Sequence, residues 1–129
     1  MSMERCQEMI LFHKSHRHLT GVGDGSDYTG IRFMHIHTPH IREWIAEVIV
    51  NLIGEIRKTS DQVVYPEMIA LNEWPIGGFQ KPHLDTYSNQ EMNHGTSPDK
   101  PSREWTCILY LNDNFNGGRT YIPDGETYE

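Results

Sequence analysis

A histidine and an aspartate, His83 and Asp85, stand at positions i and i+2 in the segment 77–85, which reads GGFQKPHLD. On a β-strand, residues i and i+2 point to the same face, so the imidazole and the carboxylate would lie side by side. Such a pair can hold two adjacent corners of an octahedral metal, with Leu84 turned to the opposite face. Short His-x-Asp matches also occur by chance, and the alternative interpretation is a surface histidine beside an aspartate at a strand end.

The residues on both sides of this pair carry further motifs. Gly77 and Gly78 precede it, and the later segment 105–123 reads WTCILYLNDNFNGGRTYIP. The order of Gly-Gly, Pro-His-x-Asp, a polar loop, Tyr-Leu-Asn-Asp, Gly-Gly-x-Thr and x-Pro resembles the prolyl-4-hydroxylase-type branch of the Fe(II)/2-oxoglutarate-dependent dioxygenases. The resemblance covers about residues 65–129, roughly half of the chain.

The resemblance implies an Fe(II)- and 2-oxoglutarate-dependent hydroxylase built on a double-stranded β-helix, the jelly-roll or cupin-like barrel. His83 and Asp85 would be two ligands of a facial triad on Fe(II), with 2-oxoglutarate and O2 at the open positions and ascorbate as an accessory reductant. Tyr110 is similar to the catalytic-site tyrosine that lines the cosubstrate pocket of that family. Thr120, two positions after Gly-Gly, is similar to the residue that touches the 2-oxoglutarate chain.

Two more candidates for cofactor binding follow from the same resemblance. Trp74 sits near the aromatic residue that walls the iron site in relatives, and ordinary core packing is an equal alternative for it. Gln80 falls where several prolyl hydroxylases have tyrosine, so here the chain departs from the family pattern.

The family's distal histidine, and the Lys or Arg that pairs with the far carboxylate of 2-oxoglutarate, come after further strands in relatives, whereas this sequence stops at Glu129. We therefore expect a truncated member: a single, incomplete oxygenase domain over residues 1–129, with only the N-terminal part of the barrel and little activity of its own. His35 and His37 could bind a metal by their spacing, but a polar strand end is the simpler interpretation. None of the other histidines occupies the third-ligand position; they are His13, His16, His18, His35, His37, His40 and His94.

The elements that must position these residues begin with a helix at about 39–58. Thr38 is a plausible cap and Pro39 suits the first helical position. The apolar residues then recur with helical spacing at Ile41, Trp44, Ile45, Val48, Ile49, Leu52, Ile53 and Ile56. This pattern predicts an amphipathic helix that supports the barrel.

After the helix the apolar period changes to two, which predicts short strands. We expect them at 63–74, 79–87, 104–111 and 119–123, with a long polar connection at 86–103 that forms a lid or stays disordered. A helix followed by strands predicts an α+β fold. Residues 1–37 show no clear period, and the glycine-rich segment 21–27 is a surface loop rather than a phosphate cradle, because it lacks the GK[ST] and GxGxxG patterns.

Composition limits the partners. A chain of 129 residues with 18 acidic and 11 basic side chains, a net charge of -7, suits one domain and disfavours nucleic acid. No apolar run, 48–50 included, is long enough to cross a bilayer, and no secretory signal is visible, so we expect a cytoplasmic protein with Cys6 and Cys107 as free thiols.

The expected substrate is a peptide or a small molecule, and the exposed edge of a partial barrel would favour oligomers. The alternative function is a cupin-like module that binds a metal or ligand without turnover. Binding of 2-oxoglutarate only in the presence of metal would distinguish the oxygenase from that module. Asp85 argues against a halogenase, which needs a small residue at this position.

Overall fold

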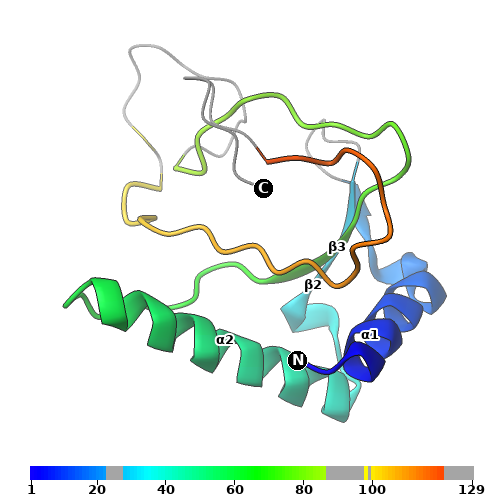
Figure 1. The fold of residues 1–129 in the computed structure, drawn as a ribbon, viewed down its shortest axis with the longest axis horizontal. Coiled ribbons are helices and arrows are strands. Elements are labelled where there is room, and N and C mark those ends of the chain that lie inside the picture. Colours follow the sequence, from blue (N-terminus) through cyan, green and yellow to red (C-terminus); the bar gives the residue numbers. More distant parts are fainter. Residues whose placement is uncertain (23–27, 87–97, 99, 121–129) are drawn as a thin grey trace. The chain divides into compact units, whose positions relative to one another are not determined.

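The computed structural model describes residues 1–22, 28–86, 98 and 100–120 (Figure 1). They divide into two compact units, each considered by itself below: Met1–Val22 with Thr29–Glu73, and the described residues of 23–28 and 74–129. The first unit contains two α-helices, two 3-10 turns and a three-stranded sheet, so the predicted α+β class is confirmed. In the described part of the chain no helix is both long and apolar enough to span a membrane.

Helix α1, Met3–Ser15, is an element that the sequence pattern did not reveal. Ser2 is its N-cap and accepts a hydrogen bond from the backbone N–H of Arg5 at 3.3 Å, while Glu4 places a negative charge in the first turn. The helix buries Met9, Phe12 and His13, and the 3-10 turn η1, Arg17–Leu19, follows it.

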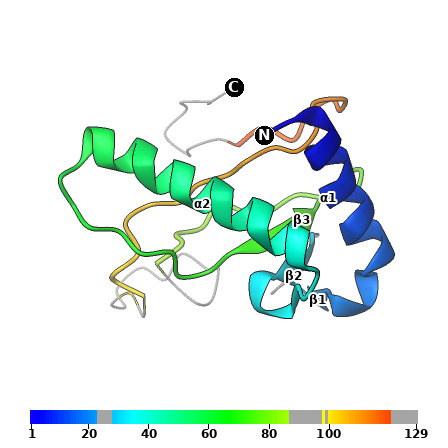
Figure 2. The same ribbon diagram turned by 90° about the horizontal axis from the view of Figure 1, so that it is seen from below.

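Helix α2, Pro39–Thr59, confirms the helix predicted at 39–58, with proline in its first turn and Arg57 and Lys58 in its last turn. Thr38 is the N-cap residue, as predicted, although its side chain makes no capping hydrogen bond. Figure 2 shows α1 beside the N-terminal half of α2, where two ion pairs join them: Arg5–Glu47 at 2.6 Å and His40–Glu8 at 2.8 Å.

The sheet has the order β1-β2-β3, from Gly21–Val22, Thr29–Arg32 and Ala70–Glu73, and both pairs are antiparallel. Ile31 on β2 lies opposite Leu71 on β3, and both side chains are buried. The second 3-10 turn η2, Phe33–His35, leads from β2 toward α2. The buried apolar residues of the described chain all belong to this unit: Met9, Phe12, Ile31, Ile36, Ile41, Ile45 and Leu71.

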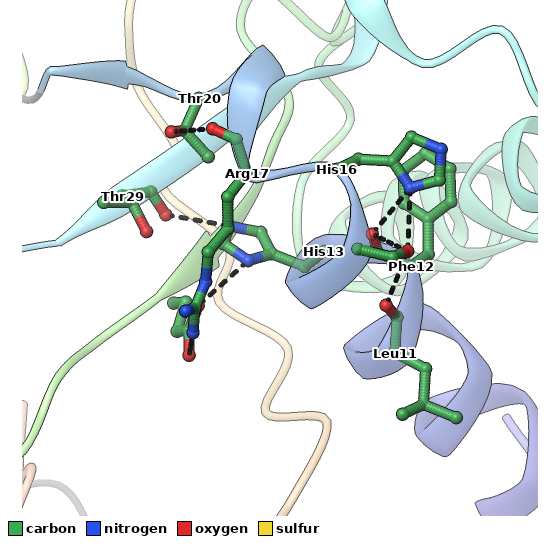
Figure 3. A network of polar contacts seen from close by, with 9 residues as sticks. Leu11, Phe12, His13, His16, Arg17, Thr20 and Thr29 are labelled. Atoms are coloured by element: carbon green, nitrogen blue, oxygen red, sulfur yellow. Dashed lines mark hydrogen bonds and ion pairs between the residues drawn. The ribbon is translucent and has the colours of Figure 1, made fainter.

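A polar cluster fastens α1 to the sheet (Figure 3). The buried ring of His13 has Nε2 3.1 Å from the carbonyl oxygen of Thr29 and Nδ1 3.1 Å from Oε2 of Glu73. The Nδ1 contact is an ion pair by distance and lacks the alignment of a hydrogen bond. Arg17 donates to both oxygens of Glu73, at 2.9 and 3.1 Å. The carboxylate of Glu73 therefore joins α1, η1 and β3, and the ring of His13 adds β2.

Most of the predicted strands are wrong within the described residues. Only 70–73 of the segment 63–74 forms a strand, and the described residues of 79–87, 104–111 and 119–123 contain none. An alternating pattern provides two faces, but a strand also needs a neighbour to share its backbone hydrogen bonds. The expected glycine-rich loop begins inside β1 at Gly21, and its residues 23–27 lie outside the described residues.

The long polar connection also falls largely outside the described residues, as do His94 and the segment 121–129. Its two ends are described, and they meet: the backbone N–H of Lys100 donates to the carbonyl oxygen of Thr86 at 2.9 Å. The segments on either side of the connection are thus tied together next to His83 and Asp85.

Candidate metal centre

A tight turn introduces the segment that carries His83 and Asp85. The backbone N–H of Gly78 donates to the carbonyl oxygen of Pro75 at 3.0 Å, and Gly77 has a φ of 78°. A positive φ at the third residue of such a turn is typical of type II and favours glycine there. A Cβ at position 78 would approach Pro75 to 3.0 Å, so the geometry of the turn favours glycine at both positions of this Gly-Gly pair.

The imidazole of His83 is fixed by the chain just before it. Its Nδ1 lies 2.9 Å from the carbonyl oxygen of Lys81, and because a carbonyl oxygen only accepts, Nδ1 is the protonated, donating nitrogen. The other ring nitrogen, Nε2, is 3.0 Å from Oδ1 of Asp85. Gln80 places its amide nitrogen 3.4 Å from the same Nε2. The side chain of His83 is 21% exposed, so the ring is partly sheltered from solvent.

The carboxylate of Asp85 is held at its second oxygen. The hydroxyl of Thr106 donates to Oδ2, which leaves Oδ1 facing His83. The main-chain oxygen of Asp85 accepts a hydrogen bond from Nη1 of Arg103 at 2.8 Å. Asp85 is 42% exposed, so a ligand from solvent can reach Oδ1.

The arrangement fits two ligands of a metal ion. Two ligands at right angles on an octahedral metal, each about 2.1 Å from it, lie about 3.0 Å apart. Nε2 of His83 and Oδ1 of Asp85 have that separation, 3.0 Å. Because Nδ1 carries the proton of a neutral ring, Nε2 has a lone pair that faces the negatively charged oxygen of Asp85, and the two repel each other. A second proton on the ring, or a metal cation between the two atoms, removes this repulsion.

Distance alone does not single out this pair, because two other imidazole–carboxylate contacts are as short. At His13–Glu73 the guanidinium of Arg17 binds both carboxylate oxygens, which makes that contact part of an ion-pair cluster. His40–Glu8 has no acceptor for the second ring nitrogen among the described contacts. His83 and Asp85 differ from His40–Glu8 because an outer partner holds the remaining polar atom of each side chain, as is usual for metal ligands. They differ from His13–Glu73 because a threonine hydroxyl on one oxygen, and not a guanidinium on both, holds the carboxylate.

A second pair of predicted site residues also meets. The hydroxyls of Tyr110 and Thr120 are 3.0 Å apart, and the ring of Tyr110 stacks on Phe115 with centroids 6.1 Å apart. Gly117 and Gly118 have φ values of 84° and 67°, so their reversal brings position 120 back beside position 110. Within the described residues no hydrogen bond or ion pair joins Tyr110 or Thr120 to His83 or Asp85.

The remaining two candidates divide. Gln80 contacts the ring of His83, whereas Trp74 packs against Tyr28 with the two rings tilted by 39° and their centroids 4.9 Å apart, and it is 46% exposed. Trp74 is therefore too exposed for the core-packing alternative, and no described contact joins it to the imidazole of His83. The described residues contain no group of three or more His, Cys, Asp or Glu side chains that could hold a metal.

Thr106, Lys81 and Arg103 contact the pair and were not predicted from the sequence. Thr106 was in principle detectable, because in the alternating segment 104–111 it shares a face with Tyr110, four positions later. The contact of Lys81 is made by its carbonyl oxygen, which every residue type has, so its side chain gives no signal.

No protein-family model, curated protein or solved structure matches this chain. Its function has to be argued from the geometry above.

Proposed function

We propose that this chain carries the iron- and 2-oxoglutarate-binding part of an Fe(II)/2-oxoglutarate-dependent hydroxylase of the prolyl-hydroxylase type. The observation that supports the proposal best is the division of polar atoms between His83 and Asp85. One atom of each side chain faces the other at 3.0 Å, and the second atom of each is held by Lys81 or Thr106. That division suits ligation of one metal through Nε2 and Oδ1.

The proposed roles follow from these contacts. The carbonyl oxygen of Lys81 fixes the ring so that Nε2 keeps its lone pair, and the hydroxyl of Thr106 occupies Oδ2. When bound there with 2-oxoglutarate, Fe(II) supplies the activation of O2 that allows hydroxylation of an unactivated C–H bond. A third protein ligand has to come from outside the described residues.

The hydroxyls of Tyr110 and Thr120 are proposed to hold the cosubstrate. They are exposed and form a hydrogen bond of 3.0 Å with each other, so one hydroxyl can donate to a carboxylate oxygen of 2-oxoglutarate while it accepts from the other. The proposal includes the double-stranded β-helix of such hydroxylases; of the strands expected for it, the described residues form β3 alone, which pairs antiparallel with β2. A peptide or small-molecule substrate, and self-association through an open sheet edge, belong to the same proposal, since the net charge of -7 disfavours nucleic acid.

Titration with Mn(II), followed by its electron paramagnetic resonance signal, tests the metal site on the tag-free chain. His83→Ala and Asp85→Asn should each weaken binding by more than about 100-fold, because loss of a ligand exceeds the 10- to 100-fold effect of losing an outer partner. The matched control is His40→Ala, which removes an imidazole–carboxylate contact of 2.8 Å elsewhere and should leave binding unchanged. Equal losses in all three variants, or no Mn(II) binding by the wild-type chain, would refute the proposed site.

A further inference from the structure

The hydroxyl of Thr106 contacts the one carboxylate oxygen that His83 does not face. We propose that Thr106 is a positioning residue for the metal: by holding Oδ2 of Asp85, it leaves Oδ1 as the single oxygen that can bind a metal beside Nε2 of His83. This inference rests on the proposed function, since it concerns the same metal.

The need for such a residue comes from the freedom of an aspartate side chain. The last torsion of aspartate is broad and has two-fold symmetry, so the two oxygens of a free carboxylate exchange places at little cost. Asp85 is 42% exposed, and water would compete for both oxygens. A hydrogen bond from a hydroxyl to an ionised carboxylate is strong enough to favour one orientation.

The segment that carries Thr106 is joined to the segment that carries His83 and Asp85 by three hydrogen bonds, so the backbone around Thr106 is held in place. The N–H of Lys100 binds the carbonyl oxygen of Thr86 at 2.9 Å, and Arg103 binds the main-chain oxygen of Asp85 at 2.8 Å. Thr106 adds the contact to the carboxylate itself. These three residues recur at every third position, so one stretch of chain fixes both the backbone and the side chain of Asp85.

This role of Thr106 affects how many coordination positions of the metal ion the protein occupies. A carboxylate that binds through both oxygens takes two positions, whereas Oδ1 alone takes one and leaves more positions for a cosubstrate. Thr106 therefore acts on the metal through Asp85 and does not touch the metal.

Three variants test this role. Thr106→Val keeps the shape and removes the hydroxyl, and Thr106→Ser keeps the hydroxyl. Mn(II) affinity should fall by about 10- to 100-fold in the valine variant and stay within about threefold of wild type in the serine variant. Thr59→Val, which removes a hydroxyl bound to the carbonyl oxygen of Ile56 on α2, is the matched control and should not change the affinity.

A second readout separates positioning from a general loss of structure. The visible spectrum of bound Co(II) reports coordination, and it should differ between wild type and Thr106→Val but agree between wild type and Thr106→Ser, with unchanged circular dichroism in all three. The inference would be overturned if Thr106→Val matched wild type in Mn(II) affinity and Co(II) spectrum, or if Thr106→Ser bound Mn(II) as weakly as Thr106→Val. In either case, metal binding by wild type that depends on His83 would still support the metal site. Failure of the wild-type chain to bind any metal would instead overturn the proposed function.

Discussion

Replacement of Glu73 by glutamine should lower the free energy of unfolding by about 2–4 kcal/mol, because this carboxylate joins α1, η1 and β3. Glutamine keeps the size of the side chain and removes its charge. His13 Nδ1 would then face an amide, and the guanidinium of Arg17 would lose both of its carboxylate contacts.

The magnitude comes from two unequal contributions. Arg17 is 62% exposed, so its pair with Glu73 is screened by solvent and contributes only about 0.5–1 kcal/mol. The His13 side chain is 4% exposed and that of Glu73 is 31% exposed, so their ion pair contributes about 1.5–3 kcal/mol, less than the roughly 3–5 kcal/mol lost when a fully buried pair is broken. The control is Glu55→Gln on α2, whose partner Lys58 lies 2.6 Å away with both side chains 68% exposed, and which should cost at most about 0.5 kcal/mol.

The effect should depend on pH with a defined sign. Burial raises the pKa of Glu73. The hydrogen bonds and charge of Arg17, together with the charges of His13 and Lys14, lower the pKa by more than burial raises it, so the pKa lies below its ordinary value of 4.5. A lowered pKa in the folded state means that the carboxylate stabilises the fold above pH 4.5 and that this contribution is lost as the pH falls through the folded value.

Urea unfolding of wild type and Glu73→Gln between pH 3 and pH 7, followed by circular dichroism, measures this difference. The gap in stability should shrink as the pH falls below 4.5. A gap no larger than that of Glu55→Gln, or one that grows toward acid pH, would show that the cluster does not hold α1 on the sheet.

The two remaining predictions concern glycines and share one assay, thermal unfolding combined with Mn(II) titration. Gly77→Ala places a side chain at a φ of 78°, so it should cost about 1–2 kcal/mol and weaken metal binding by disturbing the turn before His83. Gly54→Ala, inside α2 with open space around its Cβ, should instead stabilise the chain by about 0.5–1 kcal/mol and leave metal binding unchanged. Unchanged metal affinity in the Gly77 variant would show that the turn does not position the site.

The parts of the fold that could be predicted from sequence are those that local pattern determines. The apolar period and Pro39 define α2 closely. The side chains of His83 and Asp85 lie 3.0 Å apart, but the strand from which their common face was predicted does not form. Helix α1 was not predicted, because its buried apolar residues, Met9 and Phe12, are too few to show a helical period.

Long-range contacts set the limit of such prediction. The contact of His13 with Glu73 joins residues far apart in sequence, and nothing at either position indicates the other. The segment 104–111 alternates like a strand, yet its described residues show exposed Trp105, Ile108, Leu109 and Tyr110 without a strand partner. Whether an alternating segment pairs depends on a neighbour that its own residues do not specify.

The most direct test of the proposed function is binding of 2-oxoglutarate, measured by calorimetry under anaerobic conditions with and without Fe(II). The wild-type chain should bind 2-oxoglutarate only when Fe(II) is present, and His83→Ala should remove this binding because the metal is no longer held beside Asp85. Binding of 2-oxoglutarate without metal, or equal binding by wild type and His83→Ala, would contradict the proposed function.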